Sequence, residues 1–323
     1  MNTLERILER PEIRAKPPVL VDIGASGQLP EIWKRIAPYC ICIAFDADER
    51  EFGARVSAKH PFHTLHLHRN IVSDKKDPEL DFYLTSSPYC SSSLPPDNAK
   101  LSAWIFADLF DVQSRVKLPA NTLGAILSEH QLSYVDWYKT DSQGTDLRLF
   151  LSLGSSIVER VLTASFEPGI IDAYQGEDKL HALIAKMDQL PFWMHDIEVR
   201  GTQRLSRKLW EEKVRPLTGG SIPIGLKTSP GWAEVSYLNT LLPTERFDRR
   251  DYLLTWVFSS LHEQHGFALE VATRGVERFG DAIFRELAQE SLDRTVGVLD
   301  RLLPRTAKKV IFYVRAKTAR FRR

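Results

Sequence analysis

The sequence predicts an α/β protein in which an open, mostly parallel sheet carries helices on both faces, followed by a mainly helical C-terminal extension. Apolar runs of strand length alternate with segments of helical periodicity over about the first 200 residues. Several of these runs end in an acidic residue or a glycine turn, which is typical of buried parallel strands. From about residue 249 onward the apolar residues follow a helical spacing instead.

The predicted strands follow one another along the chain. They are PVLVDIG, CICIAFDAD, FHTLHLHRNIVSD, LSYVDWYKTD and ERVLTASFE, with ELDFYLTSS as an inserted strand or hairpin. The segment that begins at Pro30 has apolar residues at helical spacing, which predicts a helix with this proline in its first turn. The segment that ends at Gly154 predicts another helix, because a glycine is a common C-terminal cap.

Changes in composition suggest the domain boundaries. Residues 1–18 predict a short amphipathic helix, and residues 19–215 hold the predicted sheet. The Gly-, Pro- and Ser-rich segment 216–230 predicts a linker loop, and residues 231–323 predict a helical extension. Its tail, from Pro304 onward, has eight basic residues and no acidic one.

Composition and charge disfavour several classes of function. The 323-residue chain has a formal net charge of +1, so we expect no nucleic-acid partner. No window reaches the roughly 18 apolar residues of a membrane-spanning helix, and the charged N-terminal stretch does not resemble a signal peptide. Three cysteines without a CxxC pair suit a reducing compartment, so we expect a cytoplasmic protein without a structural metal. The oligomeric state is left open.

Acidic residues at the predicted strand ends indicate a ligand site. Asp22, Asp46, Asp141 and Glu167 each fall at the end of a predicted strand, and open α/β sheets bind ligands at the carboxyl ends of their strands. Asp46 comes about 24 residues after Asp22 and could accept both hydroxyls of a ribose, with Asp48 as the fallback. The alternative is that these acids are solvated loop residues.

The loop VDIGASG has the features of a ligand-binding turn. Gly24 and Gly27 would let the backbone approach a ligand, the following helix would favour a carboxylate, and Asp22 could take an ammonium group. The full G-x-G-x-x-G pattern of dinucleotide-binding proteins is absent. A plain glycine turn after a buried strand is the alternative.

The stretch VDWYKTDSQGTDLRLFLSLG closely resembles the signature of FkbM-type methyltransferases, approximately iDflKiDvEGaElevLkG. The matching residues are Asp136, Lys139, Asp141, Gly144, Leu151 and Gly154, with Gln143 in place of the usual Glu. VDIGASG, IAFDADE, NIVSD, SSSL and LTASFE resemble further elements of that family in the same order, over roughly residues 19 to 200. One departure is Gly124, where the family usually has an aspartate.

This resemblance implies a Rossmann-like class I methyltransferase fold and methyl transfer from S-adenosyl-L-methionine to a hydroxyl of a saccharide, natural product or related polyhydroxylated acceptor. The residues it assigns to the cofactor are Asp22, Gly24, Ala25, Gly27, Asp46, Asn70, Ser73 and Asp141. Those we assign to the acceptor are Tyr89, Ser93, Gln143 and Glu167. The runner-up is a non-catalytic relative that keeps the fold as a binding or assembly module.

Methyl transfer to an alcohol needs a group that removes the hydroxyl proton. Asp141 is the first candidate, followed by His130 and His195, although a lone histidine in an apolar segment is more often structural. His66 and His68 share one face of a predicted strand, but no carboxylate lies within the run, and we predict no metal there.

The basic tail has two interpretations. It could attract anionic lipid headgroups, which would place the protein at the inner face of a membrane. The alternative is a final strand or helix with a solvated end.

Overall fold

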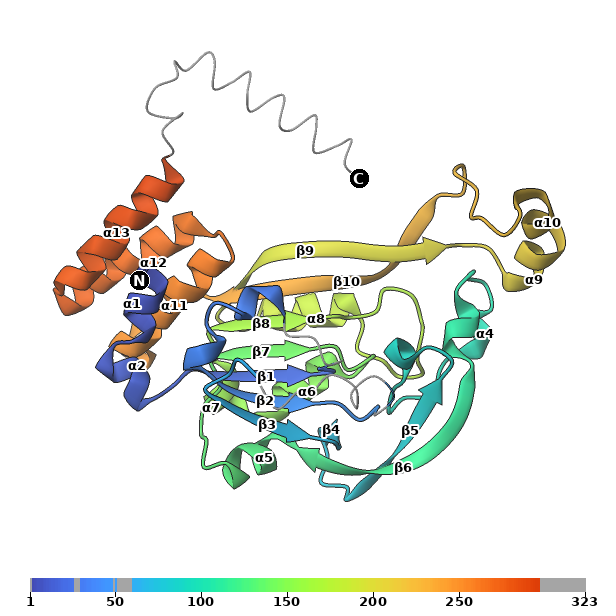
Figure 1. The fold of residues 1–323 in the computed structure, drawn as a ribbon, viewed down its shortest axis with the longest axis horizontal. Helices are drawn as coiled ribbons and strands as arrows, with labels where there is room; N and C mark the ends of the chain where they lie inside the picture. The colour runs from blue at the N-terminus through green and yellow to red at the C-terminus, as the bar shows by residue number, and fades with distance from the viewer. Residues whose placement is uncertain (1, 26–29, 49, 51–59, 297–323) are drawn as a thin grey trace, which may run out of the picture. The chain divides into compact units, whose positions relative to one another are not determined.

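The computed structural model describes residues 2–25, 30–48, 50 and 60–296. By its internal contacts the chain divides into two compact units, Met1–Leu254 and Thr255–Arg323. The sheets lie in the first unit, and the second is helical over its described part (Figure 1).

Within the described ranges, seven strands form the main sheet in the order β3-β2-β1-β7-β8-β10-β9. Their bounds are β1 Val19–Ile23, β2 Ile41–Phe45, β3 Thr64–His68, β7 Trp137–Thr140, β8 Thr163–Phe166, β9 Phe192–Gln203 and β10 Thr228–Asn239. The first five strands in this order are parallel, whereas β10 runs antiparallel to both β8 and β9. This arrangement confirms the predicted α/β fold with an open, mostly parallel sheet.

One face of the sheet is covered by helices that bury the main apolar core. The helices are α5 Leu123–Glu129, α6 Asp146–Ser152, α7 Ser155–Val158 and α8 Leu180–Met187. Tyr138 of β7 and Phe150 of α6 are fully buried there, with ring centroids 5.0 Å apart. Side chains of this size contribute on the order of 2–3 kcal/mol each when fully buried, so this layer holds the carboxyl end of β7 in place.

The opposite face is covered by irregular turns rather than by the helix predicted after Pro30. Two 3₁₀ turns, η1 Glu31–Trp33 and η2 Ala37–Tyr39, take its place, and Trp33 packs edge-on against Trp137 at 5.7 Å. Pro38 lies inside η2, where it has no N–H to continue a helix. The predicted N-terminal helix is likewise divided into α1 Thr3–Leu8 and α2 Pro11–Ala15.

The predicted third strand is divided between two sheets. β3 belongs to the main sheet, and the residues after it form β4 Ile71–Ser73 in a separate three-stranded sheet. In that sheet β6 Val112–Thr122 pairs parallel with β4 and antiparallel with β5 Glu79–Thr85, which confirms the predicted insertion. The short elements between β5 and β6 are η3 Pro88–Cys90, α4 Asn98–Leu101 and η4 Ala107–Phe110.

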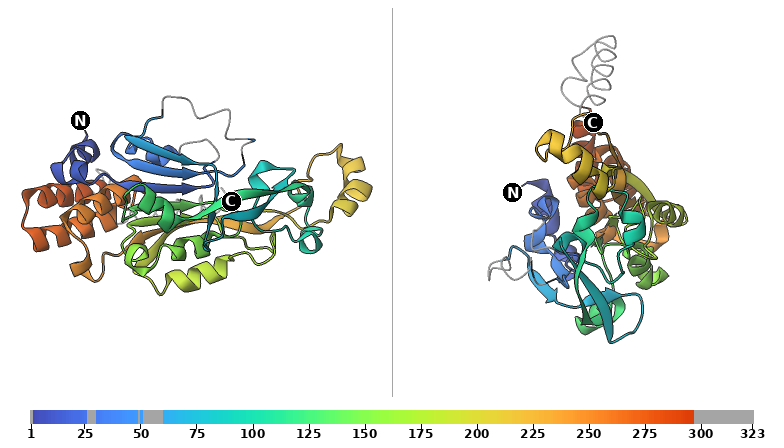
Figure 2. Two further views of the ribbon diagram at one scale, coloured as in Figure 1. Left: turned by 90° about the horizontal axis from the view of Figure 1, so that it is seen from below. Right: turned by 90° about the vertical axis from the view of Figure 1, so that its right-hand side faces the viewer.

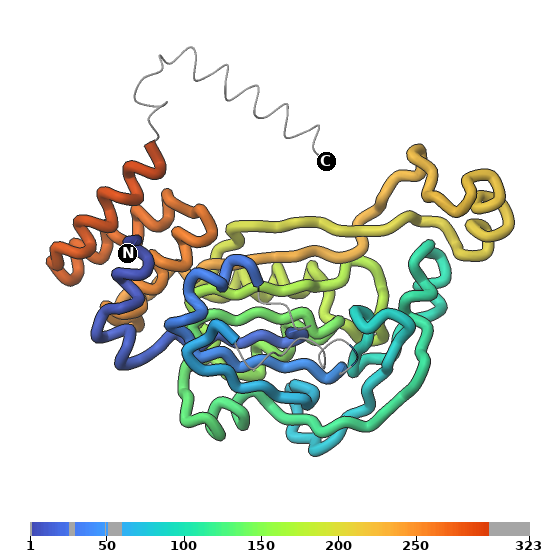
Figure 3. The backbone as a smooth tube through the Cα atoms, in the orientation of Figure 1, coloured from blue at the N-terminus to red at the C-terminus, as the bar shows by residue number. Residues whose placement is uncertain are grey.

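A long hairpin occupies the region in which we predicted a linker and the start of a helical extension. Strands β9 and β10 lie side by side, and the segment between them carries α9 Arg207–Leu209, the π-helical turn η5 Trp210–Val214 and α10 Arg215–Thr218 (Figures 1 and 3). The structure therefore places residues 228–239 in the main sheet, and helices resume after η6 Thr244–Arg246.

The C-terminal region contains three helices within its described part, α11 Arg249–Leu261, α12 His265–Phe279 and α13 Ala282–Thr295. A Cβ added at Gly275 would lie 2.4 Å from the ring of Phe284, so this glycine permits the close approach of α12 and α13. Trp256 donates a hydrogen bond to Ser291 Oγ at 2.8 Å. Among the described residues, no helix has the length and apolarity needed to cross a membrane. The basic tail lies outside the described residues.

Candidate functional site

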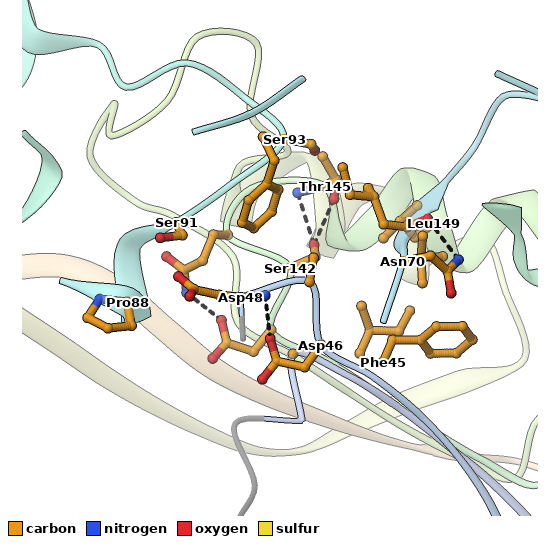
Figure 4. Close-up of a pocket in the computed structure, with 18 of the residues that line it drawn as sticks. Phe45, Asp46, Asp48, Asn70, Pro88, Ser91, Ser93, Ser142, Thr145 and Leu149 are labelled. Carbon is orange, nitrogen blue, oxygen red and sulfur yellow. Dashed lines mark hydrogen bonds between the residues drawn. The ribbon is translucent and has the colours of Figure 1, made fainter. Parts of the chain in front are cut away.

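A pocket opens at the carboxyl ends of β1, β2 and β7, and part of its wall comes from the insertion after β5 (Figure 4). It is lined by Ile23, Gly24, Phe45, Asp46, Ala47, Asp48, Asn70, Ile71, Val72, Phe82, Pro88, Tyr89, Ser91, Ser93, Asp141, Ser142, Gln143, Thr145 and Leu149. The sequence-predicted site residues among these are Gly24, Asp46, Asn70, Tyr89, Ser93, Asp141 and Gln143. The structure thus brings together residues that are up to about 120 positions apart in the chain.

Gly24 is required where β1 leaves the sheet. Its φ of +79° is a conformation that favours glycine, and an added Cβ would lie 2.2 Å from the carbonyl oxygen of Asp141. The amide of Asp141 donates to Ile23 O at 2.9 Å, and the amide of Gly24 donates to Phe45 O at 3.0 Å. Three strand ends are therefore joined by backbone contacts that leave no space for a side chain at this position.

Asp46 and Asp48 are two positions apart after β2, and their side chains have different environments (Figure 4). Arg50 donates to both carboxylate oxygens of Asp48 and also to Thr85 O and Ser91 Oγ. Although burial acts in the opposite direction, these hydrogen bonds lower the pKa of Asp48. Asp48 is thus held as a structural anion that ties β2 to the insertion.

The carboxylate of Asp46, by contrast, accepts a hydrogen bond only from the amide of Asp48, at 2.9 Å, among the described residues. Burial, together with the charges of Asp48, Asp22 and Asp141, raises the pKa of Asp46 to about 6. Its second oxygen can accept a further donor, so of this pair Asp46 suits a diol ligand better than Asp48 does.

Asp22 lies beneath the rim and does not line the pocket. It is 5% exposed and accepts a hydrogen bond from Lys139 Nζ at 2.7 Å. Burial opposes the ammonium charge of Lys139, but Asp22, Asp141 and Glu167 together raise its pKa. The positive charge of Lys139 therefore balances part of the negative charge of Asp22 and Asp141.

Asp141 projects into the pocket from the end of β7. Burial raises its pKa, while Lys139 and a hydrogen bond from Gln143 Nε2, at 2.5 Å, act in the opposite direction. Gln143 is held in place because its Oε1 accepts from Tyr174 and its backbone oxygen accepts from Ser92. An amide at this position donates to Asp141, whereas the glutamate that is usual in the resembling family would place a second carboxyl group there.

Glu167 continues a row of acids along the rim. The strand registers pair Thr140 with Phe166 and Phe166 with Val235, so the next residues, Asp141, Glu167 and Glu234, lie on adjacent strands and on one face. Burial, with the charges of Asp141 and Glu234, raises the pKa of Glu167 to about 9. Glu167 is therefore protonated at neutral pH, and it lies beside the pocket rather than among the residues that line it.

Neither candidate histidine lines the pocket. His130 caps the end of α5, where its Nε2 lies 2.9 Å from His68 Nε2 and its ring stacks on His66 at 3.7 Å. His195 lies on β9, and burial lowers its pKa to about 4. Proton removal from a ligand in this pocket would therefore fall to a carboxylate and not to His130 or His195.

The other residues that were predicted to bind the cofactor are Ser73, Ala25 and Gly27. Ser73 is buried on β4, where its hydroxyl accepts from the amide of Lys75 at 3.0 Å. The amide of Ala25 donates to Phe45 O at 2.9 Å. Neither Ser73 nor Ala25 lines the pocket. Gly27 lies outside the described residues.

Sequence reasoning missed the residues that support the site from a distance. Arg50 and Ser91 were not predicted because their link spans 41 residues and has no local signal. Asp146, fully buried at the start of α6, accepts from the amide of Ser142 at 3.3 Å, and burial next to Asp141 raises its pKa to about 7. An acidic residue in the first turn of a helix was visible in the sequence, but its burial was not.

The charge of the site is one-sided. Within the described part of the chain, the pocket is lined by three carboxylates and by no Lys, Arg or His. No group of three or more His, Cys, Asp and Glu side chains among the described residues could hold a metal ion. Apolar surfaces from Phe45, Ile71 and Val72 complete the walls, so the pocket suits a ligand with both a flat apolar part and positive charge.

A comparison with models of known protein families finds no match. No curated protein matches the chain significantly either.

Proposed function

We propose that this protein is an S-adenosyl-L-methionine-dependent O-methyltransferase that acts on a hydroxyl of a saccharide or related polyhydroxylated acceptor. The observation that carries the proposal is the pocket itself. Gly24, Asp46, Asn70 and Asp141, which the FkbM resemblance assigns to the cofactor, come from separate parts of the chain and line one cavity. The strand order, with one antiparallel strand inserted next to the edge, is also the order of the class I methyltransferase fold.

The donor groups of the pocket fit the cofactor's chemistry. When bound, S-adenosyl-L-methionine supplies an activated methyl group on a positively charged sulfur. Asp46 would accept hydrogen bonds from the ribose hydroxyls, and Gly24 would let the backbone approach the ligand closely. Asn70, with Ile71 and Val72, would contact the adenine, while the carboxylate of Asp141 would lie nearest the positive charge.

Acceptor activation would fall to the same rim. Asp141 would take the hydroxyl proton, because it is a carboxylate of the pocket lining and burial raises its pKa, which favours uptake of a proton. Tyr89, which is 59% exposed, would offer its ring to the C–H face of a sugar, and Ser93 would add a hydroxyl.

Calorimetric titration with S-adenosylmethionine and S-adenosylhomocysteine, with NAD as the control ligand, tests the proposal. We expect micromolar binding of the first two ligands and none of NAD. Asp46→Ala should abolish this binding, whereas Asp97→Ala, a helix cap away from the pocket, should leave it unchanged. If the unaltered protein binds neither ligand, the proposed methyltransferase activity is wrong, and a non-catalytic binding module becomes the better explanation.

A further inference from the structure

Residues 204–227, between β9 and β10, form a projecting segment, here called the arm. None of them is among the residues that line the pocket. The arm carries α9, η5 and α10 and extends beyond the ends of the neighbouring strands (Figures 1 and 2). Because β9 runs in the same direction as β8, the arm leaves the sheet at the carboxyl ends of the strands, the same edge at which the pocket opens.

The arm exposes large aliphatic side chains. Ile224 is fully exposed and Leu217 is 86% exposed, and Leu209 and Ile222 are each about half exposed. Leu217, Ile222 and Ile224 fall within eight consecutive residues. Several exposed apolar side chains close together in sequence lower solubility, and they are typical of surfaces that contact a partner or a membrane.

The arm is also strongly basic. It has six basic residues and two acidic ones, a net charge of +4, whereas the whole chain has a net charge of +1. Arg207 and Arg215 pair with Glu211, at 2.6 Å each. Lys213 and Lys227 form no ion pair within the described ranges, and both are exposed. These two lysines lie within four residues in sequence of the exposed Leu217 and Ile224.

This combination favours a lipid surface over a protein partner. Protein interfaces are enriched in exposed aromatic residues and depleted in lysine, but the one aromatic residue of the arm, Trp210, is buried. Exposed leucine and isoleucine flanked by lysine and arginine are typical of segments that lie in the interface of an anionic bilayer. We propose that the arm docks this protein on an anionic membrane, with Leu217, Ile222 and Ile224 entering the headgroup region.

The membrane docking does not depend on the proposed function. Its consequence does: the pocket would open on the membrane-facing edge, so the acceptor of a methyltransferase docked in this way would be linked to a lipid. Calorimetric titration with the cofactor and binding to vesicles are separate measurements, and either can fail while the other succeeds.

Co-sedimentation of the full chain with vesicles tests the docking. We expect binding to an equimolar mixture of phosphatidylcholine and phosphatidylglycerol and little binding to phosphatidylcholine alone. The double variant Lys213→Ser/Lys227→Ser should bind the anionic vesicles about 25-fold more weakly, at about fivefold for each charge removed. Leu217→Ser/Ile224→Ser should also weaken binding, and added salt should weaken that of the unaltered chain.

Two control pairs are also exposed but lie outside the arm. Ile197→Ser/Val199→Ser removes exposed aliphatic side chains from β9, and Lys75→Ser/Lys76→Ser removes exposed charges near β4. Both controls should bind like the unaltered chain. The proposal is overturned if the unaltered chain does not bind anionic vesicles. It is equally overturned if both arm variants bind undiminished, since the binding would then come from another segment, such as the basic tail.

Discussion

The two ends of strand β7 carry aspartates with opposite environments. At the amino end, Asp136 is 3% exposed, and its carboxylate accepts from both Nη atoms of Arg250, at 2.8 and 2.9 Å, and from the amide of Val19 at 2.9 Å. At the carboxyl end, Asp141 is only partly buried and faces other acids, and among the described residues its hydrogen-bond donor is the neutral Gln143.

This difference distinguishes a structural acid from the acid that we propose as functional, within the single stretch from Asp136 to Asp141. A buried carboxylate that accepts from a guanidinium and a backbone amide uses most of its acceptor sites and is closed off from a ligand. A carboxylate in a pocket with a raised pKa keeps that capacity, at a cost in stability. The predictions below test the two ends separately.

The largest effect is expected at the amino end. Arg250→Ala should lower the free energy of unfolding by about 3–5 kcal/mol, because it leaves Asp136 buried without its counter-charge. Arg200→Ala is the control, since Arg200 pairs with Glu198 and Glu234 while about half exposed, and it should cost only about 0–1 kcal/mol. Urea denaturation measures both, and equal losses in the two variants would contradict the structural role of the Asp136–Arg250 pair.

An intermediate effect is expected at Gly24. Gly24→Ala should cost about 1–3 kcal/mol for its positive φ alone, and the contact of the new Cβ with Asp141 O should in addition abolish binding of S-adenosylhomocysteine. Gly124→Ala is the matched control: it lies in α5 with open space around it and should gain up to about 1 kcal/mol. Thermal melts with and without S-adenosylhomocysteine separate the two effects; a Gly24→Ala protein with unchanged binding would remove this glycine from the site.

A further expected effect is a pH dependence at Glu167. Its pKa is raised to about 9 from 4.5, so the folded state binds more protons than the unfolded state between these values. The contribution of Glu167 to stability is therefore full below about pH 4.5 and is lost as the pH rises toward 9. Glu167→Gln should accordingly gain melting temperature relative to the unaltered protein at pH 9 but not at pH 5. A gain that is the same at both pH values would show that Glu167 is not held protonated.

Several expectations failed for identifiable reasons. The helix expected after Pro30 is absent because Pro38 interrupts it. The segment 216–230 has the composition of a linker, yet it belongs to a hairpin whose paired residues are 25 to 47 positions apart in sequence. In the same way His130 was expected near the site, but its partners are His66 and His68 on a strand more than 60 positions earlier.

The sequence alone determined the features that depend on local chemistry. Apolar runs ending in Asp46, Asp141 and Glu167 indicate strands and their rim, and glycines such as Gly154 mark helix ends, because periodicity and backbone freedom act over a few residues. Only the tertiary structure decided which acids remain available to a ligand. Lys139 reaches Asp22 across 117 positions, Arg250 reaches Asp136 across 114, and Arg50 links Asp48 to the insertion. The charge and pKa of a carboxyl group depend on neighbours in space, and these neighbours are brought together only when the chain folds.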